Sequence, residues 1–179
     1  TGRKWEYTLY PISWEEFEAK IGYLNAQLQL ENRLIFGFYP EVLNNPGQER
    51  EILHELVNSY LYRDILALAG IRKPEILEKL VRALAFQAGS EVNYNELSQI
   101  VGISKTTVQS YIDVLEKSYI IYRLGSFSRN LRNEITQGKK VYFWDNGIRN
   151  AVISNFSPLE LRTDKGSLWE NFLITERLK

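Results

Sequence analysis

The stretch NYNELSQIVGISKTTVQSYIDVLEKSYIIYRL, residues 93–124, constrains the fold more than any other part of the chain. Apolar residues recur at helical spacing on both sides of Gly102, which predicts two short helices joined by a tight turn. Ser104 stands where a side-chain oxygen caps the first amides of the second helix, and Asn93 or Asn95 has the same role for the first. This pattern is typical of a helix-turn-helix.

The residues that follow predict two strands and a long connection. Residues 119–124 and 140–144 have strand character, and the polar, basic segment 125–139 lies between them. A strand, a long loop and a second strand after a helix-turn-helix make the layout of a winged helix. We therefore predict a winged helix over residues 74–145, with residues 125–139 as its wing.

The rest of the chain has mostly helical patterns. Ser13 and Glu16 have the spacing of a capping box, which predicts a helix start. The Gly- and Pro-containing segment 34–48 is expected to be a loop. Further helices are expected over residues 48–69, 74–88, 146–153 and from 167 onward. The predicted fold class is α+β, mainly α: a helical segment followed by a winged helix-turn-helix, with partial flanking domains.

Composition excludes several kinds of chemistry. The chain has no cysteine, so disulfides, thiolate metal sites and cysteine nucleophiles are excluded, and a single histidine argues against a His-based metal site or triad. No catalytic or metal-binding residue is predicted. Lys+Arg and Asp+Glu are both 22, but residues 122–179 carry 10 basic against 6 acidic groups, so the positive excess lies in the last third.

The ends and the hydropathy of the chain bear on its cellular location and on membrane association. No apolar run approaches the roughly 18 residues that span a membrane, and no signal peptide opens the chain. We therefore expect a cytoplasmic location and no membrane partner. The chain begins with Thr1 and contains no methionine, which indicates a fragment or a processed protein.

The outer face of the second helix is the candidate nucleic-acid surface. In a helix-turn-helix, the first residues of that helix reach base edges in the major groove, and a basic wing follows the phosphates. The residues predicted to contact nucleic acid are Lys105, Thr106, Thr107, Gln109, Ser110, Arg129, Arg132, Lys139 and Lys140. Asp113 and Glu116 dilute the positive charge, and the same fold also packs against proteins. Contact with a protein partner, or self-association, therefore remains an alternative.

Carboxylates and a lysine-containing run suggest two other kinds of site. Asp145, Glu170 and Glu176 are carboxylates of the last third, where a metal-dependent nuclease would need two or three to converge. Glutamates on a helix surface are more often simply solvated. The run GISKTT suggests a phosphate-binding loop, but Ser104 precedes Lys105 where that loop needs a glycine.

Three short runs, in this order, resemble one large family. They are LYPISWEEF (residues 9–17), SYLYRD (59–64) and GSLWENF (166–172). The sequence resembles prokaryotic ATPases of the AAA superfamily that carry a C-terminal, nuclease-like domain of unknown function. The resemblance covers nearly the whole chain.

That resemblance implies a division into four segments. Residues 1–45 would be the trailing edge of the ATPase core, 46–73 a lid-like helical segment, 74–145 the winged helix, and 146–179 the incomplete start of the nuclease-like domain. Glu170 matches the glutamate on the first helix of that domain. It would be a remnant of a nuclease-like site.

The resemblance also implies a function. The parent protein would bind and hydrolyse ATP with Mg²⁺ at sites that precede this chain, so the chain itself would hold no cofactor and would not be catalytic alone. Its winged helix would contact DNA or a partner domain. The alternatives are a free-standing winged-helix transcriptional regulator, with residues 1–73 as a dimerisation arm, and a winged-helix protein-interaction module.

Overall fold

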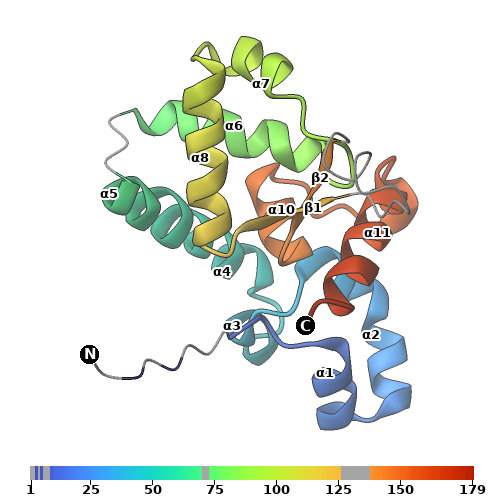
Figure 1. Cartoon of the computed structure of the whole chain (residues 1–179). Coiled ribbons are helices and arrows are strands. Elements are labelled where there is room, and N and C mark those ends of the chain that lie inside the picture. Colours follow the sequence, from blue (N-terminus) through green and yellow to red (C-terminus); the bar gives the residue numbers. More distant parts are fainter. Residues whose placement is uncertain (1–2, 4, 6–8, 70–72, 126–137) are drawn as a thin grey trace.

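The computed structural model of the chain describes residues 3, 5, 9–69, 73–125 and 138–179 (Figure 1). These residues are mainly helical, and their sheet consists of two antiparallel strands. The predicted class, α+β and mainly α, is confirmed.

Helices α1 (Trp14–Ile21) and α2 (Tyr23–Phe36) form the N-terminal hairpin. The predicted capping box is present, since the Ser13 hydroxyl accepts from the Glu16 amide and the Glu16 carboxylate accepts from the Ser13 amide. Such a reciprocal cap satisfies two amide donors that the helix start leaves unpaired. Phe17 is buried in a small aromatic cluster at this end of the molecule.

The predicted loop over residues 34–48 is partly wrong. Its first three residues belong to α2, and a further helix, α3 (Pro40–Asn44), begins soon after. Between them Gly37 has a positive φ of 71°, and a Cβ there would overlap the carboxylate of Asp145. Glycine is therefore required at this turn, both for its backbone conformation and for the close approach of Asp145.

The helix predicted over residues 48–69 is present, with a change of helical type in its middle. It consists of α4 (Glu49–Leu56), the π-helix η1 (Val57–Asp64) and α5 (Ile65–Ala69). Positions spaced by four drift around an α-helix of 3.6 residues per turn, and the wider π-helical turn offsets that drift. One side of the stretch thus stays in the core through Leu53, Val57, Leu61 and Ile65.

The central helices and the sheet follow in the predicted order. They are α6 (Pro74–Phe86), α7 (Tyr94–Val101), α8 (Lys105–Lys117), and the antiparallel strands β1 (Ile121–Gly125) and β2 (Lys139–Phe143). Of the predicted wing, residues 126–137 lie outside the described residues.

The junction between α8 and β1 is a Schellman motif. The Tyr119 amide donates to the Glu116 carbonyl (3.0 Å), and the Ile120 amide donates to the Leu115 carbonyl (3.1 Å). Tyr119 has φ 53°, a left-handed conformation that glycine usually supplies at this position. A residue with a Cβ costs roughly 1–2 kcal/mol there. The Tyr119 side chain is nevertheless 49% exposed.

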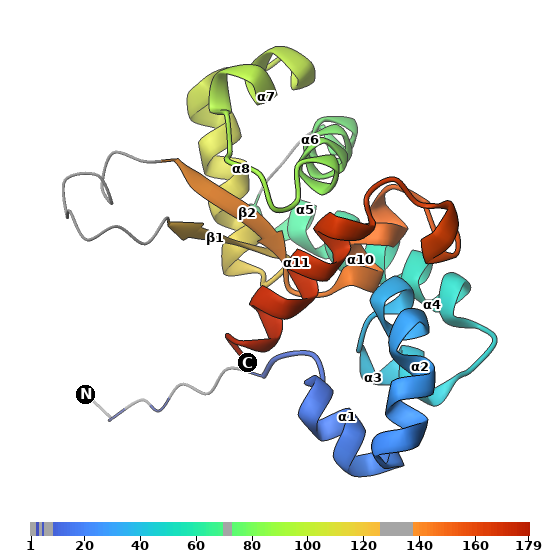
Figure 2. The same cartoon turned by 90° about the vertical axis from the view of Figure 1, so that its right-hand side faces the viewer.

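Helix α10 (Asn146–Val152) is the centre of the molecule. All seven of its residues are buried, and it packs against α2, α4, α6 and α11 (Lys165–Glu176). The 3₁₀ turn η2 (Leu159–Leu161) connects α10 to α11. In both views α7 and α8 lie at one end, α1 and α2 lie at the other, and α10 lies between them (Figures 1 and 2).

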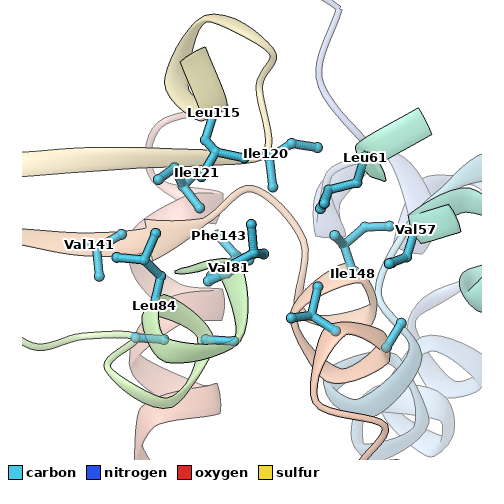
Figure 3. Close-up of a cluster of buried hydrophobic side chains, with 14 of the residues drawn as sticks. Val57, Leu61, Val81, Leu84, Leu115, Ile120, Ile121, Val141, Phe143 and Ile148 are labelled. Carbon is cyan, nitrogen blue, oxygen red and sulfur yellow. The ribbon is translucent and has the colours of Figure 1, made fainter. Parts of the chain in front are cut away.

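One cluster of buried hydrophobic side chains runs from Leu34 to Leu168. Figure 3 shows the part in which Leu61, Ile120 and Phe143 come together from η1, the α8–β1 junction and β2. The cluster takes side chains from each of the four segments into which the sequence was divided. The boundaries of those segments stay a prediction.

Two arginines are buried beside α10 and share one carboxylate. The side chains of Arg149 and Arg162 are 3% and 0% exposed, and both make ion pairs with Asp164. Arg149 also donates to the Ala85 carbonyl (2.8 Å), and Arg162 donates to the amide oxygen of Asn150 (2.9 Å). This arrangement, the arginine network, ties α6, α10 and the start of α11 together.

Asp145 is a buried carboxylate that joins two distant segments. Its Oδ1 accepts from the Ile148 amide (3.1 Å) and caps α10, while its Oδ2 accepts from the Phe38 amide (2.7 Å). Burial raises the pKa of Asp145, and the hydrogen bonds from Phe38 and Ile148 oppose that effect.

Candidate nucleic-acid interface

The turn between α7 and α8 is built as the sequence predicts. Asn93 Oδ1 accepts from the first amides of α7, and Ser104 Oγ accepts from the Thr107 amide (3.1 Å) at the start of α8. Gly102 takes the left-handed conformation, with φ 77°. Ile103 packs against the main core. The two caps and the glycine fix the direction in which α8 leaves the turn.

The first half of α8 exposes polar side chains. Lys105, Thr106 and Ser110 are exposed and Gln109 is half-buried, so these four predicted residues share an accessible face. Thr107 is half-buried, and its hydroxyl is hydrogen-bonded to Ser104 (2.8 Å). The prediction that Thr107 faces a ligand therefore has less support, because its side chain belongs to the helix cap.

Arg123 of β1 neutralises the acidic side chains in the second half of α8. Its guanidinium makes ion pairs with Asp113 (2.6 Å) and Glu116, and it donates to the Tyr94 hydroxyl (2.6 Å). The hydrogen bond with Glu116 is the largest of the effects that raise the pKa of Arg123. The two acidic residues that dilute the charge of α8 are thus paired within the fold. Sequence reasoning missed Arg123, because only the position of β1 beside α8 brings it there.

Lys140 and Glu170 pair with each other across β2 and α11. Lys140 Nζ lies 3.0 Å from Glu170 Oε1, and the same oxygen accepts from the Tyr142 hydroxyl (2.8 Å). The Lys140 ammonium is the main cause that lowers the pKa of Glu170. Lys140 is therefore ion-paired with a carboxylate, and Glu170, whose side chain is 42% exposed, has structural partners in Lys140 and Tyr142.

The other predicted basic residues differ in what the structure describes. Lys139 is exposed at the start of β2, and its carbonyl accepts from the Val92 amide (2.9 Å). Arg129 and Arg132 of the predicted wing lie outside the described residues. The structure therefore brings together Lys105, Thr106, Gln109 and Ser110 and leaves the contribution of the wing as a prediction.

The carboxylates considered for metal chemistry have other partners. Asp145 caps α10, and Glu176 Oε2 accepts from the Trp14 amide (2.5 Å). Within the described ranges, no three His, Cys, Asp or Glu side chains are grouped as a metal ion would need. Nor does any helix in the described part of the chain have the length and apolar character needed to cross a membrane.

Two curated proteins are similar to this chain. An uncharacterized protein of Haemophilus influenzae is 28% identical over 166 residues, which cover 86% of this chain and 41% of that protein. An uncharacterized protein of Methanocaldococcus jannaschii is 24% identical over 193 aligned positions, which cover 98% of this chain and 42% of that protein. The chain therefore spans about two fifths of the length of these relatives. No solved structure matches it.

These comparisons overturn the expected membership of the AAA ATPases with a nuclease-like domain, because no family of either kind matches. The short runs behind that expectation have local structural roles: LYPISWEEF contains the capping box of α1, and GSLWENF lies in α11. Glu170, expected as a nuclease-like remnant, pairs with Lys140. The expectation of ATP and Mg²⁺ in a parent protein loses its basis with the resemblance. Residues 27–159 match the domain of unknown function DUF8612, and the chain belongs to that family.

Proposed function

We propose that residues 74–145 form a winged helix that binds duplex DNA, with the first half of α8 in the major groove. The observation that carries the proposal is the exposed face of Lys105, Thr106, Gln109 and Ser110. The first half of α8 contains no acidic residue, and the acids of its second half are ion-paired with Arg123.

The size and attachment of α8 suit this role. Its 13 residues span about 20 Å, which is longer than the roughly 12 Å width of the major groove. The caps at its start and its packing against the main core hold the helix in one orientation. A rigid, solvent-facing helix loses little conformational entropy on binding.

The exposed residues differ in the contacts they would make. Lys105, at the first position of α8, would contact a phosphate and contribute mainly to affinity. Gln109 can bond adenine through both its amide atoms, and Thr106 and Ser110 can donate or accept at base edges. Binding would therefore be salt-dependent through Lys105 and sequence-dependent through Gln109. Sequence-dependent binding would agree with a transcriptional regulator.

Replacing Lys105 with alanine is expected to weaken binding to short random-sequence duplexes and to flatten its salt dependence. One lost phosphate contact lowers the slope of log K against log salt by about 0.9. Fluorescence anisotropy across a series of salt concentrations measures both quantities. Lys20→Ala is the matched control, because Lys20 is an exposed lysine on α1, at the other end of the molecule.

The control separates a surface on α8 from general attraction to a polyanion. Lys20→Ala should leave the slope unchanged. Equal slopes for Lys105→Ala and the unaltered protein, or no binding to duplex DNA at low salt, would remove α8 as the contact surface.

A second candidate, a protein-interaction module, has an observation of its own. Phe86 and Ile100 are 65% and 39% exposed and line a groove of about 530 Å³ between α6 and α7. If the groove served self-association, sedimentation velocity would show a concentration-dependent dimer that Phe86→Ser removes. A dimer that persists in Phe86→Ser, or a monomer at all concentrations, would exclude self-association through this groove.

A further inference from the structure

A second groove lies at the opposite end of α8 from the proposed DNA-binding face. It has a volume of about 420 Å³, and we name it the aromatic groove. The side chains that define it are Tyr10, Pro11, Tyr39, Pro40, Tyr119 and Trp144. A groove of this size accommodates a few residues of a peptide.

The aromatic rings are held in place by one another and by the core. Tyr10 is stacked on Trp144, with ring centroids 4.6 Å apart and an interplanar angle of 27°. The Trp144 ring also contacts the Tyr122 ring, with centroids 4.5 Å apart. The backbone amide of Trp144 donates to the Ile120 carbonyl (3.1 Å). The wall of the groove is therefore preformed, which lowers the entropy lost when a ligand binds.

Tyr119 is the second, independent observation. Its ring meets the Tyr10 ring edge-on, with centroids 6.4 Å apart. The residue has the left-handed conformation of a helix-ending glycine and exposes about half of its side chain. A strained backbone that presents an exposed aromatic ring to a groove is typical of a binding site. A glycine would adopt this backbone conformation without strain but would lose the ring contacts with Tyr10 and Trp144.

The charges beside the aromatic groove are acidic. Leu9, Tyr10 and Pro11 separate it from a neighbouring groove of about 370 Å³ that Glu15, Glu16 and Glu176 line together with Lys179. Lys179 is paired with Glu176 (2.8 Å). Glu15 and Glu16 are exposed on the first turn of α1. Glu16 uses its Oε2 for the capping box with Ser13, which leaves its Oε1 and the Glu15 carboxylate to face a cation from outside.

We infer that the aromatic groove binds a proline-rich segment of another protein, in the polyproline II conformation, next to a basic residue that pairs with Glu15 and Glu16. Grooves lined by tyrosine and tryptophan fit the ridges of a polyproline II helix, which is already extended before it binds. The carboxylates favour a cationic neighbour and repel the phosphates of a nucleic acid. This site is additional to the proposed DNA contact and does not depend on it.

The probes are two synthetic peptides, each a run of prolines with one charged end, arginine in the first and glutamate in the second. Isothermal titration calorimetry with the folded chain is expected to show about tenfold tighter binding of the arginine peptide. Tyr119→Gly should remain folded, because glycine suits the backbone at this position, and should bind the arginine peptide about tenfold more weakly.

A charge reversal tests the orientation of the peptide without touching the aromatic groove. Glu15→Lys should reduce or invert the preference for the arginine peptide, whereas Glu31→Lys, on the exposed side of α2, should leave it unchanged. Failure of both peptides to bind, or a fully folded Tyr119→Gly that binds as tightly as the unaltered chain, would overturn the proposal. So would a Tyr119-dependent dimer without peptide, or Tyr119-dependent binding of oligothymidylate, because either would identify a different occupant.

Discussion

Replacing Asp164 with alanine is expected to lower the free energy of unfolding by about 4 kcal/mol, since breaking a buried ion pair leaves an uncompensated charge. Asp164 is the shared partner of Arg149 and Arg162, whose side chains are almost completely buried. Its removal leaves two cations without a counter-ion in the centre of the molecule. Chemical denaturation measures the loss, and Glu160→Ala, an exposed carboxylate of the same connection, should change stability little.

The stabilisation by Asp164 should also depend on pH in one direction. Burial alone would raise the pKa of Asp164, but hydrogen bonds from Arg162 and Arg149 hold it at about 2, below the unfolded value of 3.8. The stabilisation is therefore complete above pH 3.8 and is lost as the pH falls toward 2. If Asp164→Ala were as stable as the unaltered chain at neutral pH, the arginine network would not hold α10 in place.

Replacing Asp145 with alanine is expected to lower the free energy of unfolding by about 3 kcal/mol, the second large effect. The change removes the cap of α10 and leaves the buried Phe38 amide without its acceptor. Removal of a desolvated carboxylate offsets part of this cost. Asn93→Ala, which removes the solvent-exposed cap of α7, is the matched control and should cost about 1 kcal/mol. A loss no larger than in this control would contradict the structural role given to Asp145.

Asp145 should respond to pH in the opposite sense from Asp164. Because burial raises its pKa in the folded state, the folded protein binds this proton more tightly than the unfolded chain does. The stability that the protonated group contributes is present below pH 3.8 and declines as the pH rises through the folded pKa. The stability difference between the unaltered chain and Asp145→Asn should therefore fall as the pH rises above about 4. A difference that is constant between pH 3 and 8 would show that burial does not perturb this group.

Features set by neighbouring residues could be predicted from the sequence. The cap of α1 at Ser13, the cap of α8 at Ser104 and the left-handed turn at Gly102 depend on contacts within four residues. The order of α7, α8 and the two strands also follows from hydrophobic periodicity. The polar face of α8 was therefore predictable before its surroundings were known.

Features set by tertiary contacts could not be predicted in the same way. Arg123 neutralises Asp113 and Glu116 only because β1 lies beside α8. Asp145 was considered as a metal ligand, and its burial against Phe38 depends on a contact between residues 107 positions apart. The π-helical segment in the helix over residues 48–69 also could not be predicted, because no residue pattern marks it and its position depends on packing against the core. Sequence motifs therefore predict which helix residues are exposed better than they predict which residues those side chains contact.

The central position of α10 has a consequence for how the chain is made. One hydrogen bond joins Asn150 of α10 with Ile35 of α2, and another joins Asp145, the cap of α10, with Phe38, which follows α2; these pairs are 115 and 107 residues apart. The ribosome therefore completes α2 well before it synthesises α10, the helix that covers it. Until then, the apolar side of α2 stays exposed on the nascent chain. Long-range closure of this kind slows folding and prolongs exposure to aggregation. We expect the N-terminal helices to depend on chaperones until synthesis passes α10.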